Sequence, residues 1–136
     1  MKRKNFIQTL GTVGVLGVTS STLLAANHKK VKPVVFHYLL FWLKPELSVT
    51  QVEEFKQFFE GLKKLPYVKN VRYGKPAASS PRTVLDNSFT YNVSMEFDSL
   101  EELEAYGKLP QHLALVAQYK PYFDRMMVHD SVYENL

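Results

Sequence analysis

The residues from Val34 to Lys44 constrain the fold more than any other part of this chain. Ten consecutive positions are apolar apart from His37, and aromatic and β-branched side chains dominate them. A run of this kind predicts a β-strand that is buried on both of its faces, and Pro45 ends it. Such a strand requires one apolar layer above its sheet and a second apolar layer below it.

The periodicity of the remaining chain predicts the other elements. Ser48-Val49-Thr50-Gln51 has the form of a capping box, and it opens a helix that Pro66 ends. A second capping box, Ser99-Leu100-Glu101-Glu102, opens a short helix that we expect Gly107 and Pro110 to interrupt. A further helical piece from Gln111 to about Tyr119 follows it. Alternating apolar and polar residues, or short apolar runs, predict strands over residues 34–44, 68–75, 89–97 and 125–133.

The element order is therefore β-α-β-β-α-β. This order predicts an α+β, ferredoxin-like fold in which the helices cover one face of an antiparallel sheet. One sheet face then lacks a cover, although the strand over residues 34–44 is apolar there too. We expect a second copy of the chain to cover that face.

The N-terminal segment predicts an export signal. Lys2-Arg3-Lys4 precedes a weakly apolar run containing several glycines, and Leu24-Ala25-Ala26 offers a cleavage site. The run is too poor in apolar residues for a stable membrane span, although an uncleaved anchor is an alternative. The segment resembles a twin-arginine signal with Lys4 in place of the second arginine, so both the Tat and Sec routes stay open. We expect residues 1–26 to be a signal, 27–33 a linker and 34–136 a periplasmic or cell-envelope domain.

Charge and cysteine content exclude several classes of partner. The signal contains three of the 17 Lys and Arg residues and none of the 13 acids, so the mature domain carries 14 minus 13, or +1. A nearly neutral domain with no basic run beyond Lys29-Lys30 is not expected to bind nucleic acid or an anionic membrane. The chain contains no cysteine, which excludes disulfide and thiol chemistry.

Two sequence features point to chemistry. Tyr106 and His112 place a phenol and an imidazole on either side of Pro110, and His37 lies within an apolar strand, where a polar ring needs a partner. Structural roles are the alternative: Tyr106 could anchor the short helix, His112 could cap the next helix, and His37 could be a hydrogen-bonded core residue. The spacing of the histidines, including His129, offers no zinc site, so we expect no metal.

Several residues also match a known family. They are His37 with Lys44 in the first strand, Phe97-Asp98-Ser99, Tyr106 followed by Pro110-Gln111-His112, and Asp130 in the last strand. With these residues the chain resembles the stress-responsive dimeric α/β-barrel (Dabb) family over nearly all of the mature sequence. The resemblance implies two ferredoxin-like chains whose sheets close into a barrel, with a pocket between sheet and helices in each chain.

The resemblance also implies site residues. In a plant cyclase of this family, which closes a linear polyketide by aldol condensation, the catalytic tyrosine and histidine match Tyr106 and His112, and a first-strand histidine matches His37. Lys56 and Glu60 replace apolar pocket residues of that enzyme, which argues against the same substrate. The remaining pocket positions are apolar and map onto Leu39, Phe41, Phe55, Phe59, Val93, Leu115, Val116 and Met126.

Three functions follow as hypotheses. The first is an exported homodimer that binds a small apolar molecule near His37, Tyr106 and His112. The second is a cofactor-independent lyase or cyclase, in which His112 is the general base and Tyr106 donates a hydrogen bond to the oxyanion. The third is a stress-associated structural dimer that binds no ligand because its own side chains fill the pocket.

Overall fold

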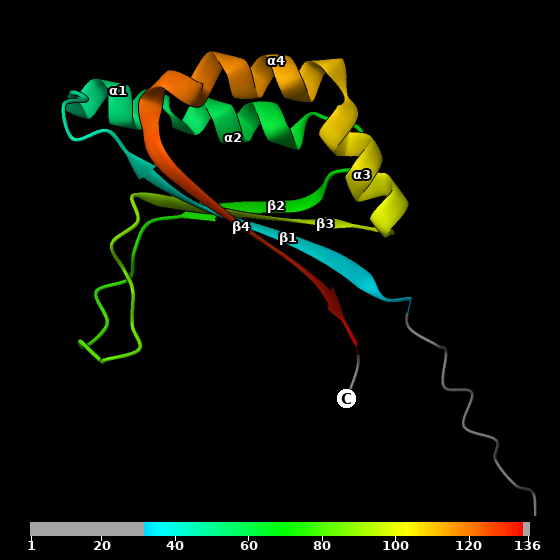
Figure 1. The fold of residues 1–136 in the computed structure, drawn as a ribbon, viewed down its shortest axis with the longest axis horizontal. Helices are drawn as coiled ribbons and strands as arrows, with labels where there is room; N and C mark the ends of the chain where they lie inside the picture. Colours follow the sequence, from blue (N-terminus) through cyan, green and yellow to red (C-terminus); the bar gives the residue numbers. More distant parts are fainter. Residues whose placement is uncertain (1–31, 135–136) are drawn as a thin grey trace, which may run out of the picture.

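The protein is described by a computed structural model that places residues 32–134. They form two layers, a four-stranded antiparallel sheet with helices on one face (Figure 1). This arrangement confirms the predicted α+β, ferredoxin-like fold. The predicted signal, residues 1–26, and most of the predicted linker, residues 27–33, lie outside the described residues. Within residues 32–134, no helix combines the length and the apolar character needed to cross a membrane.

The sheet has the order β2-β3-β1-β4, so the strand that is apolar on both faces lies inside it. The strands are β1 (Val34–Leu43), β2 (Lys69–Gly74), β3 (Tyr91–Phe97) and β4 (Phe123–Tyr133). The helices are α1 (Val49–Glu54), α2 (Lys56–Lys63), α3 (Leu100–Lys108) and α4 (Pro110–Tyr119), and a 3₁₀ turn, η1 (Lys120–Tyr122), leads into β4.

The two capping boxes form differently. Ser48 accepts a hydrogen bond from the backbone N–H of Gln51, and the Gln51 side chain accepts one from the N–H of Ser48, as predicted. Ser99 likewise accepts from the N–H of Glu102. The Glu102 carboxylate, however, accepts from the N–H of Asp98 rather than from that of Ser99. The second box is therefore only half formed, because the acid reaches one residue further back along the chain.

Two predicted helix boundaries were wrong. The single helix expected after Ser48 is divided at Phe55, where the N–H of Phe58 bonds to the Phe55 carbonyl in a tighter turn. Gly107 does not interrupt α3, which continues to Lys108. The break falls instead at Leu109, whose ψ of 129° is extended, because the residue before a proline disfavours helical geometry.

An aromatic cluster joins the sheet to α1 and α2. The ring of Phe41 on β1 lies 5.3 Å from that of Phe55, 5.7 Å from that of Phe58 and 6.0 Å from that of Phe59, measured between centroids. Phe41, Phe55 and Phe59 are fully buried. These separations and tilted or edge-on geometries are favourable for aromatic pairs, so this cluster is the centre of the core.

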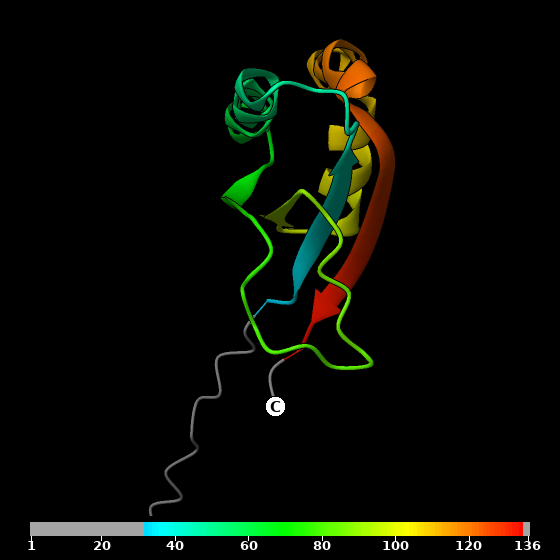
Figure 2. The ribbon, with the colours of Figure 1, turned by 90° about the vertical axis from the view of Figure 1, so that its left-hand side faces the viewer.

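The other sheet face has no helix over it in the described part of the chain (Figure 2). We call it the uncovered face; on β1 it carries four half-buried side chains, those of Phe36, Tyr38, Leu40 and Trp42. At one end, the Arg125 guanidinium lies 4.1 Å from the centre of the Trp42 ring. The loop between β2 and β3, residues 75–90, extends on this side of the sheet (Figures 1 and 2).

Candidate functional site

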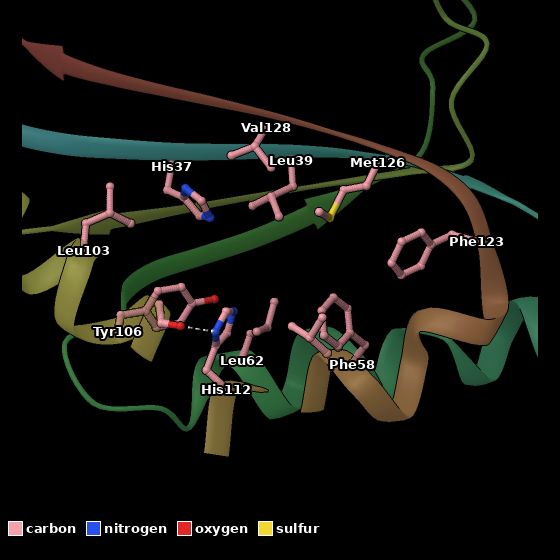
Figure 3. Close-up of a pocket in the computed structure, with 12 residues that line it drawn as sticks. His37, Leu39, Phe58, Leu62, Leu103, Tyr106, His112, Phe123, Met126 and Val128 are labelled. Atoms are coloured by element: carbon pink, nitrogen blue, oxygen red, sulfur yellow. Dashed lines mark hydrogen bonds between the residues drawn. The ribbon is translucent and has the colours of Figure 1, made fainter. Parts of the chain in front are cut away.

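A cavity of about 210 Å³ lies between the helix face of the sheet and the helices (Figure 3). Three of its lining residues, His37, Tyr106 and His112, have polar side chains, and none is a Lys, Arg, Asp or Glu. The remaining lining residues are apolar or glycine: Leu39, Phe58, Leu62, Leu103, Gly107, Val116, Phe123, Met126 and Val128. The cavity is thus an apolar pocket with a few polar groups, which is typical of small-molecule sites.

His37 is oriented by an acid on the neighbouring strand. Its Nδ1 lies 2.5 Å from Oδ1 of Asp130, because the register of β1 and β4 pairs these two residues directly. A carboxylate accepts a hydrogen bond, so Nδ1 carries the proton and donates it. Nε2 is then left toward the cavity, as the close-up shows (Figure 3). The structural alternative for His37 was a fully hydrogen-bonded core residue. Only Nδ1 has such a partner among the described residues, and Nε2 faces the cavity.

Tyr106 is the one buried residue of α3, with 2% of its surface exposed. Its ring centroid lies 5.0 Å from that of Phe97 and 4.3 Å from that of His112. Burial raises the pKa of the phenol well above its usual value, which keeps the hydroxyl protonated at neutral pH. Within residues 32–134 this hydroxyl makes no hydrogen bond, so the proton is available to a molecule in the cavity.

His112 lies in the first turn of α4 and bonds back to α3. Its Nδ1 is 3.3 Å from the carbonyl oxygen of Gly107 (Figure 3), and a carbonyl can only accept, so Nδ1 carries the proton. Burial lowers the pKa of His112, the nearby His37 lowers it further, and the Gly107 carbonyl opposes both effects. The ring is therefore neutral at pH 7, with the lone pair on Nε2 free to accept a proton.

The structure brings together only some of the predicted pocket residues. Leu39, Val116 and Met126 line the cavity. Phe41, Phe55, Phe59 and Val93 do not; they are fully buried in the core, because the aromatic rings pack on one another and on β3. Leu115 is also absent from the lining. It packs against Gly61 of α2, where an added Cβ would lie only 2.8 Å from its terminal methyl groups.

Lys56 and Glu60, the two charged positions that argued against the substrate of the plant cyclase, do not reach the cavity. Lys56 pairs with Glu53 at the junction of α1 and α2, and Glu60 is exposed on α2. Neither residue lines the cavity. The apolar character of the pocket is therefore unaffected by these substitutions.

The prediction missed Asp130 as a site residue, together with six lining residues. Asp130 carried part of a signal, since the ferredoxin-like order places the last strand beside the first, but the register that pairs it with His37 comes from the structure. Val128 carried one too, because it lies two positions from Met126 and so shares its strand face. The other lining residues missed were Phe58, Leu62, Leu103, Gly107 and Phe123.

Residues 32–134 contain no group of three or more His, Asp or Glu side chains placed to hold a metal ion. His129 pairs with Tyr38 and so lies on the uncovered face, away from the cavity.

Comparison with known proteins identifies the family. The profile of the stress responsive A/B barrel domain matches residues 35–133. Olivetolic acid cyclase from Cannabis sativa is 25% identical over 97 residues, which cover 71% of this chain and 93% of the cyclase.

Solved structures share the fold. Hydroxynitrile lyase from Passiflora edulis matches with a TM-score of 0.65 and 17% identity, covering 78% of this chain and 98% of that one. A dimeric ferredoxin-like protein of unknown function from Thermobifida fusca matches with a TM-score of 0.59 and 19% identity, covering 79% and 97%. With its fold, its cavity and the match over residues 35–133, this chain belongs to the stress responsive A/B barrel domain family.

Proposed function

We propose that this protein is a homodimer that binds a small, uncharged and largely apolar molecule in the cavity of each copy. One observation supports the proposal above all: the polar groups of His37, Tyr106 and His112 converge on a cavity that is otherwise apolar. A charged ligand is disfavoured, since no Lys, Arg, Asp or Glu lines the cavity and burial of an unpaired charge is costly.

The size of the cavity limits the ligand. An apolar cavity of about 150 Å³ is large enough to bind benzene. The cavity here, about 210 Å³, therefore suits a molecule with one ring and a short substituent, or an aliphatic molecule of similar bulk. Its polar group would lie at the end near α3, and its apolar part would contact Phe58 and Phe123.

Filling the cavity tests the binding proposal. We expect Val116→Trp to weaken binding of 4-ethylphenol, a neutral one-ring probe with a short substituent, by at least about tenfold, because the larger side chain takes the space of the ligand. Calorimetric titration would measure the affinity. Leu113→Trp is the matched control, since Leu113 is exposed on the same helix, and it should bind as the wild type does. Equal affinities for the two variants would contradict the proposal.

A second candidate function is proton transfer at a carbon atom beside a carbonyl group. The neutral imidazole of His112 and the protonated phenol of Tyr106 lie side by side, with ring centroids 4.3 Å apart. Nε2 of His112 would take the proton from carbon, the electron pair of the broken C–H bond would form a C=C bond, and the π pair of the carbonyl would move onto its oxygen. The Tyr106 hydroxyl would stabilise that oxyanion by a hydrogen bond. The similarity to olivetolic acid cyclase supports this candidate.

The third hypothesis, a structural dimer without a ligand, required a pocket filled by the protein's own side chains. The open cavity argues against it.

We further propose that residues 1–26 are removed on export and that the mature protein is dimeric in the periplasm or cell envelope. The apolar uncovered face and the dimeric relatives support the dimer. Native mass spectrometry of protein purified from its own host should give a dimer of chains that lack residues 1–26. Chains of full length would contradict cleavage, and a monomer would contradict the dimer.

A further inference from the structure

One strand of the site is left open to solvent. We call Met126, Val128, Asp130 and Val132 the β4 stripe, because alternate residues of a strand share one face, here the face that carries the helices. Met126 is 43% exposed, Val128 40% and Val132 47%, and the Asp130 side chain is 47% exposed. On the same sheet face, Val35, Leu39 and Phe41 of β1 are all buried. The helices therefore cover β1 but leave the β4 stripe partly exposed to solvent.

Three residues of the β4 stripe, all except Val132, belong to the site. Met126 and Val128 line the cavity, and the Asp130 carboxylate accepts a hydrogen bond from Nδ1 of His37. Figure 3 shows Val128 and Met126 on the sheet side of the cavity, opposite His112 and Phe58. The cavity thus has one wall whose side chains are nearly half exposed, whereas small-molecule sites usually enclose most of their ligand.

The outer edge of β4 is also unpaired within the described residues. β4 is hydrogen-bonded to β1 on one side and ends the sheet on the other. It is 11 residues long, and a long, exposed edge strand with apolar side chains pairs readily with another chain unless something covers it.

We propose that a second copy of this chain covers the β4 stripe and so completes the wall of the cavity. This inference rests on the proposed function, both for the ligand site and for the dimer. A second copy is the partner that covers the stripe because the apolar surface continues around β4 from one face to the other. Met127 pairs with Leu40 and belongs to the uncovered face, whereas its neighbours Met126 and Val128 belong to the stripe. A partner that lies on the uncovered face reaches the edge of β4 and the stripe beyond it.

Covering the stripe has two effects on the site. It removes the exposed apolar surface of Met126 and Val128 from water, which is favourable in proportion to the area buried. It also excludes water from the hydrogen bond between His37 and Asp130, which strengthens that bond in a less polar environment. A single copy should therefore bind the ligand more weakly than the dimer does.

Val132→Arg tests the inference without altering the cavity, because Val132 lies on the stripe but does not line the cavity. We expect this variant to be monomeric by light scattering and to bind 4-ethylphenol at least about tenfold more weakly than the wild-type dimer does. Val49→Arg is the matched control. Val49 is 82% exposed at the start of α1, so the same substitution there should change neither the oligomeric state nor the affinity.

The outcomes separate this inference from the proposed function. If wild-type protein fails to bind the probe, the proposed ligand site is wrong. If the wild type binds and a monomeric Val132→Arg binds equally well, the partner does not complete the site. A Val132→Arg protein that stays dimeric with unchanged affinity would show that the stripe lies outside the interface. If the variant does not fold, dilution of the wild type until the dimer dissociates must lower the affinity, and an unchanged affinity overturns the inference.

Discussion

Replacing Phe55 by alanine is expected to lower the free energy of unfolding by about 3–5 kcal/mol. The Phe55 side chain is fully buried, and its ring centroid lies 5.3 Å from that of Phe41, 5.4 Å from that of Phe59 and 5.9 Å from that of Tyr119. The substitution leaves a cavity where the sheet, α2 and α4 meet. Single domains are stable by only about 5–15 kcal/mol, so much of the stability would be lost.

Urea unfolding of the protein would measure the loss. Val49→Ala is the control, since an exposed side chain typically contributes within about 0.5 kcal/mol. Phe55→Leu should fall between the two, because it keeps part of the apolar volume. A loss below about 1 kcal/mol for Phe55→Ala would mean that the aromatic cluster is not the centre of the core.

Replacing His112 by alanine is expected to lower the rate of proton exchange at carbon by about 100-fold to 10,000-fold, the usual contribution of a general base. Phenylacetone is a suitable probe, because it is neutral, has one ring and has an acidic C–H group beside its carbonyl. Deuterium uptake in D₂O, followed by NMR, measures the rate without knowledge of the natural substrate. Gln111→Ala is the matched control, since Gln111 precedes His112 on α4, is exposed and does not line the cavity, and it should exchange at the wild-type rate.

The same reaction should depend on pH in a specific direction. Burial lowers the pKa of His112 below its usual value of 6.5, and only the neutral ring is a base. The wild-type rate should therefore be fully retained at pH 7 and fall as the pH drops through the lowered pKa. A wild-type rate no faster than that of His112→Ala would exclude proton transfer and leave the binding function. If the rate already begins to fall above pH 7 as the pH is lowered, a group other than His112 is responsible for the fall.

The fold could be predicted because its signals are local. Strict alternation in β3, an apolar run in β1 and the capping residues Ser48 and Ser99 each depend on a few neighbouring positions. The order of the elements then leaves few topologies. Tyr106 and His112 could be predicted to lie together because they are only six positions apart in the sequence, so their proximity is also a local signal.

The outline of the cavity could not be predicted in this way, because it depends on which rings fill the core. Phe55, Phe58 and Phe59 are equally apolar in the sequence, yet only Phe58 lines the cavity. The tight turn at Phe55 divides the helix. The rings of Phe55 and Phe59 are then fully buried in the core, whereas that of Phe58 reaches the cavity. Asp130 shows the same limit: its role depends on strand register, which brings it opposite His37 across 93 positions of the chain.

The hydrogen bond from His112 to the Gly107 carbonyl has a consequence for how such proteins diversify. It ties α4 to the last turn of α3 across the Leu109-Pro110 joint, so the phenol and the imidazole belong to one short, self-contained segment. The walls that contact a ligand come from other segments, chiefly α2 and β4. Mutations can therefore reshape the walls while Tyr106 and His112 keep their spacing. For protein engineers, this separation makes α2 and β4 the places to randomise when a new ligand is sought.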